Sequence, residues 1–101
     1  MADITCEELK QRLDNGEKIN LVDVREPFEH EAFSIGGKLI PLGILPYKLD
    51  ELNELQDEEV VIYCRSGNRS GHAKNFLMQN NFSNVRNLLG GMIEWQNLNS
   101  D

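Results

Sequence analysis

Short apolar runs alternate along this chain with segments whose apolar residues recur every three or four positions. The clearest run is residues 60–63, which are apolar throughout, as in a strand that is buried on both faces of a sheet. Further candidate strands are residues 3–4, 21–24, 38–40 and 85–88. The alternation of such strands with helical segments indicates an α/β fold, with a mostly parallel sheet and helices on both of its faces.

The helical segments are marked by their end signals and by their apolar spacing. Thr5 and Glu8 form a capping box, and Gly16 closes the helix that follows. Pro27 stands where the first helical residue often lies, so we expect a helix over residues 28–33. Three more helices are predicted from groups of apolar residues at helical spacing: Leu45, Leu49 and Leu52; Ala73, Phe76 and Leu77; Met92, Ile93 and Trp95.

The length of the chain suits one domain, over residues 1–101, and is too short for two. Its two cysteines, Cys6 and Cys64, are too few for a disulfide framework. No apolar run reaches the ~18 residues of a membrane span, and the first residues do not have the pattern of a signal peptide. We therefore expect a cytoplasmic protein that has no membrane partner.

The net charge of −7 argues against a nucleic-acid partner, because such binding depends on Lys and Arg side chains that neutralise phosphates. The charge is unevenly distributed along the chain. Residues 1–63 carry a net charge of −9, and residues 64–101 carry a net charge of +2. An anionic ligand is therefore expected to prefer the second half of the chain.

Candidate chemistry lies in residues 64–70, Cys-Arg-Ser-Gly-Asn-Arg-Ser, between the buried strand and a helix. In open α/β sheets ligands bind beyond the carboxyl ends of the strands, which is where this order places Cys64. A short loop with Gly67 can turn several N–H groups inward as a nest for an anion, and the next helix adds the positive end of its dipole. Arg65 and Arg69 add two cations. Together these groups are expected to favour the thiolate, the nucleophilic form of Cys64.

A buried structural thiol is the plain alternative for any cysteine. Two flanking arginines, a glycine and a place between strand and helix distinguish Cys64 from that case. Cys6 has no such surroundings, and we expect it to have no chemical role. His30 and His72 would allow a protease-like Cys–His pair, but no spacing requires one, and His72 is expected to face solvent or to pack.

Three segments resemble the signatures of the rhodanese family of sulfurtransferases, and together they cover most of the chain. They are residues 21–27 with Glu29, Glu31 and Ala32; residues 64–69; and Val85, Leu88, Gly90, Gly91 and Trp95. Each segment alone is a weak signal, whereas all three in this order and at this spacing are a specific one.

The resemblance implies a three-layer α/β/α fold with a five-stranded parallel sheet in the strand order 1-5-4-2-3. It also implies that Cys64 carries a sulfane sulfur as a persulfide. The N–H groups that would cradle this sulfur belong to Arg65, Ser66, Gly67, Asn68, Arg69 and Ser70. Arg65 and Arg69 would bind an anionic donor such as thiosulfate, and Asp23 and Arg25 would support the loop as an ion pair. The acceptor would be cyanide, a small thiol or a protein thiol, and no metal or cofactor would take part.

One segment departs from the family's pattern. Where the family usually has Gly-His-Ile-x-Gly-Ala after the acidic helix, this chain has Phe33 followed by residues 34–38, and the next strand is one residue shorter. In the family this segment borders the pocket. Phe33 in place of glycine therefore bears on the width of the pocket and on the second substrate.

Three other functions fit parts of the pattern. Cysteine-dependent phosphatases and arsenate reductases of the related fold also place a thiolate in an arginine-ended loop. Those phosphatases space the two residues as C-x5-R, whereas Cys64 and Arg69 are spaced as C-x4-R, which suits one sulfur atom rather than a tetrahedral oxyanion. A binding module without activity is disfavoured because Cys64 is present. A sulfur relay that receives its persulfide from a partner protein stays open, since it differs only in the donor.

Overall fold

The computed structural model describes residues 2–98 and contains a parallel sheet in the spatial order β2-β1-β3-β4. The strands are β1 (Asn20–Asp23), β2 (Lys38–Leu39), β3 (Glu59–Tyr63) and β4 (Asn84–Asn87). The last four residues of β3 are buried, as its uninterrupted apolar run predicts. This strand therefore lies at the centre of the fold and delivers the residue that follows it, Cys64, to the end of the sheet.

The expectation of five strands is wrong for the described residues, in which four strands form the sheet. Residues 3–4 contribute only one isolated parallel bridge, between Ile4 and Leu88. The Ile4 N–H donates to the Asn87 carbonyl and the Leu89 N–H donates to the Ile4 carbonyl, but Thr5 already caps a helix. The segment is therefore too short for a strand, although its position beside β4 agrees with the strand order that the resemblance implied.

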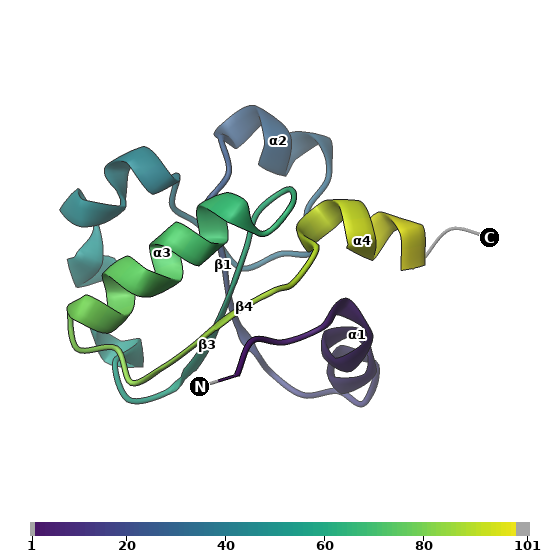
Figure 1. Ribbon diagram of the computed structural model, residues 1–101, viewed down its shortest axis with the longest axis horizontal. Coiled ribbons are helices and arrows are strands. Elements are labelled where there is room, and N and C mark those ends of the chain that lie inside the picture. The colour runs from purple at the N-terminus through teal and green to yellow at the C-terminus, as the bar shows by residue number, and fades with distance from the viewer. Residues whose placement is uncertain (1, 99–101) are drawn as a thin grey trace.

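Four α-helices accompany the sheet: α1 (Cys6–Asp14), α2 (Pro27–Ala32), α3 (Asn68–Gln79) and α4 (Gly91–Leu98). The start of α1 is as predicted, because the Thr5 hydroxyl accepts a hydrogen bond of 3.1 Å from the Glu8 N–H. Figure 1 shows α3 on one side of the strands and α1 with α4 on the other. No helix among residues 2–98 has the length and apolar character needed to cross a membrane.

Two clusters of apolar side chains form the core. One contains alternate residues of the strands, among them Val22, Val60 and Ile62, packed with Leu77 of α3. The other contains the residues between them, such as Val61, together with side chains of α1 and α4. Both faces of the sheet are therefore covered by apolar contacts. Because α2 buries none of its side chains, the full three-layer arrangement stays a prediction.

The helix predicted from Leu45, Leu49 and Leu52 is wrong in type. This part of the chain forms three short 3₁₀-helices, at Leu42–Tyr47, Leu49–Glu51 and Asn53–Leu55. Pro46 lies inside the first of them, and its missing N–H disfavours a continuous α-helix. Leu45 and Leu52 are nevertheless buried, so the apolar positions were predicted correctly while their backbone was not.

Candidate active site

The segment between β3 and α3 places Cys64 at the carboxyl end of the central strand. Gly67 caps α3 with φ of 101°, a left-handed conformation that a side chain would disfavour. This turn lets α3 begin at Asn68 and points the first N–H groups of the helix back toward Cys64. Figure 1 shows the turn between the N-terminal ends of α3 and α4, near α2.

The Cys64 sulfur lies inside the nest that the loop forms. It accepts hydrogen bonds from the Gly67 N–H at 3.1 Å and from the Ser70 N–H at 3.4 Å, and the Ser70 hydroxyl lies 3.3 Å away. Burial raises the pKa of the Cys64 thiol, but hydrogen bonds from the Ser70 hydroxyl and from the N–H groups of Ser70, Gly67 and Ser66 outweigh it and lower the pKa below its usual value. The loop therefore stabilises a thiolate at this position.

The side chain of Cys64 has no exposed area. Its sulfur occupies the centre of the nest, where an anion bound by the loop would otherwise lie. A molecule from solvent can touch the sulfur only after the thiolate moves outward or the loop opens.

Helix α4 holds the loop in this orientation. The Met92 N–H donates to the Cys64 carbonyl at 2.9 Å, and the Ile93 N–H donates to the Arg65 carbonyl at 3.0 Å. Both carbonyls are thereby turned toward the N-terminus of α4, which leaves the N–H groups of the loop facing the sulfur. Gly91 makes this approach possible, because a Cβ atom there would lie 2.5 Å from the Cys64 carbonyl oxygen.

Asn87, at the end of β4, is a site residue that the sequence analysis missed. Its side-chain N–H donates to the Gly67 carbonyl at 3.1 Å, and its oxygen accepts from the Ser70 hydroxyl at 2.5 Å. Ser70 has one hydroxyl proton, so Asn87 and the Cys64 thiolate compete for it. A polar residue at an inward-facing position, two residues after buried Val85, was the signal that could have indicated Asn87.

The two loop arginines have different surroundings. Arg69 forms a bidentate ion pair with Glu29 of α2, at 2.7 and 2.9 Å. The hydrogen bonds from this guanidinium are the main cause that lowers the pKa of Glu29 to about 2. Arg65 is exposed, and within residues 2–98 its guanidinium forms no ion pair. The loop hydrogen bonds, rather than these cations, are the main groups that lower the pKa of Cys64.

Asp23 and Arg25 lie next to the loop and form a buried ion pair. The Arg25 guanidinium donates to both Asp23 carboxylate oxygens, and it also donates to the Phe33 carbonyl at 2.6 Å. The Nδ1 atom of His30 lies 2.8 Å from the same carboxylate. Arg25 also lies over the ring of Tyr63, 5.6 Å from its centroid. This cluster ties the end of β1 to α2 and to the segment after it.

The segment that departs from the family's pattern borders a hollow of about 370 Å³ beside the loop. Phe33 lies on this hollow together with Arg65 of the loop and Ile93 of α4. His72, in contrast, is exposed on α3. Among residues 2–98, no three His, Cys, Asp or Glu side chains come together as a set of metal ligands.

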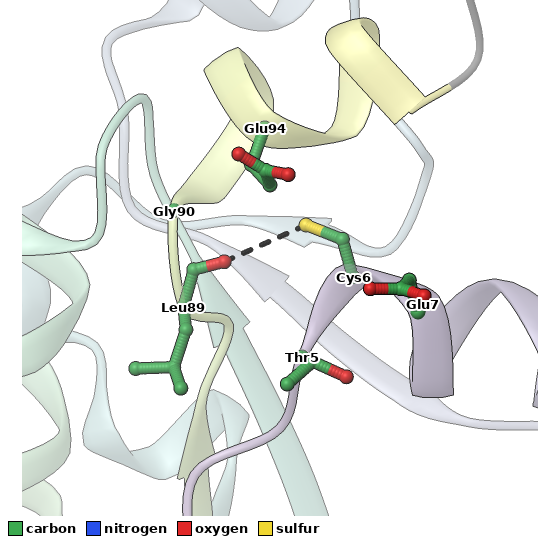
Figure 2. Close-up of a pocket in the computed structure, with 6 residues that line it drawn as sticks. All are labelled: Thr5, Cys6, Glu7, Leu89, Gly90 and Glu94. Atoms are coloured by element: carbon green, nitrogen blue, oxygen red, sulfur yellow. Dashed lines mark hydrogen bonds between the residues drawn. The ribbon is translucent and has the colours of Figure 1, made fainter.

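Cys6 lies in a different environment, which Figure 2 shows. Its thiol donates to the carbonyls of Leu89 and Gly91, at 3.5 and 3.6 Å, beside a hollow of about 270 Å³. Burial, with a smaller contribution from Glu94, raises the pKa of Cys6 to about 11. The thiol therefore stays protonated near neutral pH, where it supports the start of α4 instead of acting as a nucleophile.

A thiolate held in an N–H nest at the carboxyl end of a parallel strand defines a class of α/β proteins with a cysteine nucleophile. Within that class, residues 5–98 match the family model described as "Rhodanese-like domain". The chain belongs to this family.

Curated relatives and solved structures agree with this assignment. A sulfurtransferase of Allochromatium vinosum is 43% identical over 92% of this chain and 86% of its own length. The putative sulfur carrier protein YrkF of Bacillus subtilis is 39% identical over 92% of this chain, which spans half of that protein. A rhodanese-like domain protein from Staphylococcus aureus has a TM-score of 0.80 and 34% identity, with 94% of this chain and 91% of that chain covered.

The Ser70 hydroxyl gives a prediction about ionisation of Cys64. Ser70→Ala removes a hydrogen bond to the thiolate, so we expect the Cys64 titration midpoint to rise. At a pH below the midpoint, the rate of alkylation should fall about threefold to tenfold, as expected for one hydrogen bond. The measurement is thiolate absorbance and alkylation rate against pH, in a Cys6→Ser background. Ser66→Ala is the control, because Ser66 acts through its N–H. Equal midpoints in the Ser70 and Ser66 variants would contradict this assignment.

Proposed function

We propose that this protein is a sulfurtransferase that moves a sulfane sulfur from thiosulfate, or from a similar donor, to cyanide or a thiol. The observation that carries the proposal is the Cys64 sulfur itself, which accepts hydrogen bonds from the Gly67 and Ser70 N–H groups. These N–H groups stabilise a thiolate and then a persulfide of the same charge. The family and its sulfurtransferase members support this reaction class.

The reaction runs in two half-reactions. The Cys64 thiolate attacks the outer sulfur of thiosulfate, a new S–S bond forms, and the original S–S bond breaks so that sulfite leaves with the electron pair. The outer sulfur then carries the negative charge of the Cys64 persulfide. Cyanide attacks that outer sulfur and leaves as thiocyanate, which restores the thiolate. No proton is transferred when cyanide is the acceptor, so no general base is needed.

The loop residues have distinct parts in this proposal. Arg65 attracts the anionic donor, while the N–H groups of residues 65–70 hold the sulfur that Cys64 carries. Asp23 and Arg25 act through position, because their buried ion pair braces the segment that carries Phe33. None of these steps requires a metal or a cofactor.

The test is mass spectrometry of the intact protein after thiosulfate. We expect a mass gain of one sulfur atom on Cys64, which disappears when cyanide or a small thiol is added. Steady-state rates should follow ping-pong kinetics, because sulfite leaves before the acceptor binds. Absence of the sulfur adduct and of turnover with every donor would overturn the proposal.

A sulfur relay is the second candidate, and the similarity to a protein named as a putative sulfur carrier favours it. It uses the same Cys64 persulfide but receives the sulfur from a protein persulfide. A protein donor that loads Cys64 much faster than thiosulfate does would favour the relay. Loading by thiosulfate with rapid discharge to a small acceptor would favour the enzyme.

Loop length leads to a prediction about phosphate esters. The N–H groups of the loop close on a single sulfur atom, with Gly67 3.1 Å from it. We therefore expect the wild type to hydrolyse aryl phosphates no faster than Cys64→Ser does. Insertion of one residue between Gly67 and Asn68 should lower sulfur transfer. Phosphatase activity of the wild type that depends on Cys64 would show that the loop accommodates an oxyanion.

A further inference from the structure

The charged side chains beside the Cys64 loop are mostly neutralised. Glu29 pairs with Arg69 through two hydrogen bonds, and buried Asp23 pairs with Arg25. Arg65 remains, and among residues 2–98 no carboxylate pairs with it. The charged side chains that line the hollow, taken together with their ion-pair partners, therefore have a net charge of +1.

The hollow beside this charge is lined by apolar side chains that water reaches. Phe28 is 71% exposed, Phe33 38% and Ile93 42%. Large apolar side chains gain free energy when a ligand covers them, and aromatic rings also stack on flat apolar groups. The volume of about 370 Å³ is in the range of small-ligand pockets. The site therefore combines a single cation with an apolar wall.

We propose that Glu29 and Phe33 make this protein selective for monoanionic organic thiosulfonates, R–SO₂–S⁻ with an apolar R group, over dianionic thiosulfate. This inference rests on the proposed sulfurtransferase function and names the donor class of the same site. The single charge of the thiosulfonate matches Arg65, and its R group covers Phe33. Thiosulfate brings a second negative charge, and Arg69, already held by Glu29 in a bidentate ion pair, is not available to neutralise it.

The transfer step balances for this donor. The Cys64 thiolate attacks the outer sulfur of R–SO₂–S⁻, and the S–S bond to the oxidised sulfur breaks. The electron pair leaves with the sulfinate R–SO₂⁻, and Cys64 becomes a persulfide anion. The charge is the same before and after the step, and no proton or external oxidant takes part.

Glu29→Gln tests the charge part of the proposal with little change of shape. The Glu29 side chain also accepts a hydrogen bond from the Glu26 N–H at the start of α2, and a glutamine amide oxygen can accept the same bond. The substitution releases Arg69 from its ionic partner. We expect kcat/KM for thiosulfate to rise about threefold to tenfold, as for a charge-assisted contact, while kcat/KM for benzenethiosulfonate changes less than about twofold.

Glu31→Gln is the matched control. Glu31 is exposed on the same helix and carries the same charge, but Arg69 pairs with Glu29. We expect this variant to leave the ratio of the two kcat/KM values unchanged. The ratio is the readout because any change in Cys64 reactivity affects both donors equally. A Glu29→Gln variant that keeps the wild-type ratio would overturn the role of Glu29.

Phe33→Ala tests the apolar part. The Phe33 carbonyl that Arg25 contacts is retained, since only the side chain is removed. We expect kcat/KM for benzenethiosulfonate to fall about fivefold, the effect of losing part of an apolar contact, and that for thiosulfate to stay within about twofold. Tyr47→Ala, at an aromatic residue 82% exposed outside the hollow, should change neither value.

The outcomes separate this inference from the function on which it rests. A wild type that prefers benzenethiosulfonate, with the ratio shifted by Glu29→Gln and Phe33→Ala, supports the inference. Turnover that depends on Cys64 but prefers thiosulfate overturns the inference and leaves the sulfurtransferase function intact. Absence of turnover with both donors overturns the two together.

Discussion

Cys64→Ser should abolish sulfur transfer from every donor and should prevent formation of the sulfur adduct in the intact protein. Serine keeps a hydroxyl in the nest, so the fold should be preserved. An alkoxide is not formed at neutral pH, however, and a hydroxyl cannot accept the sulfane sulfur as a stable persulfide. The effect should therefore appear as loss of turnover with unchanged thermal stability. Turnover that survives in Cys64→Ser would remove the basis of the mechanism.

Cys6→Ser is the control for this variant. The Cys6 thiol donates to the carbonyls of Leu89 and Gly91, and a serine hydroxyl can donate in the same direction. Because burial raises the pKa of Cys6 to about 11, this thiol contributes little thiolate near neutral pH. Sulfur transfer and the adduct should both be retained. If the adduct is lost in Cys6→Ser, the reactive sulfur belongs to Cys6, and the assignment to Cys64 is wrong.

The position of Cys64 at the end of the central strand could be predicted from the sequence because it depends on local order. A buried strand, a loop of small residues and a helix follow each other between residues 59 and 79. In a parallel sheet such an order places the loop at the carboxyl end of the strand. The hydrogen bonds from Gly67 and Ser70 to the Cys64 sulfur arise within this one segment.

The partners of the loop could not be predicted, because they come from distant parts of the chain. Glu29 lies 40 residues from Arg69 and still forms its ion pair, which changes the charge that a donor meets. Asn87 is 17 residues from Ser70 and contacts its hydroxyl. Spacing along the sequence carries no information about such contacts until the strand order is known. Arg69 was accordingly expected to bind an anionic donor, and its ion pair with Glu29 was not predicted.

The errors in the fold have similar causes. The apolar spacing of Leu45, Leu49 and Leu52 records which side chains are buried, but it does not distinguish an α-helix from successive 3₁₀ turns around Pro46. The two-residue segment before Thr5 has strand character, but the cap of α1 limits it to one bridge. Local pattern therefore predicted burial better than it predicted the extent of each element.

Gly91→Ala should cause the largest loss among substitutions outside the loop. Gly91 has φ of 55°, and a Cβ atom there would lie 2.5 Å from the Cys64 carbonyl oxygen and 2.6 Å from that of Arg65. Neither contact can be relieved by a side-chain rotation, because both neighbours are backbone atoms. The start of α4 would have to move, and the Met92 and Ile93 N–H groups would no longer hold the loop carbonyls. We expect stability to fall by about 3 kcal/mol or more and sulfur transfer by on the order of a hundredfold.

Gly16→Ala separates the backbone cost from the collision. Gly16 also has positive φ, 84°, but a Cβ atom there would meet no other atom within 4 Å. This variant should lose about 1 kcal/mol, the cost of a left-handed alanine, and keep full activity. Denaturant unfolding and thiosulfate turnover measure both quantities. If the two variants lose equal stability and both stay active, α4 does not position the loop. If Gly91→Ala loses more stability than Gly16→Ala and also raises the Cys64 titration midpoint, α4 sets the direction of the N–H groups that stabilise the thiolate.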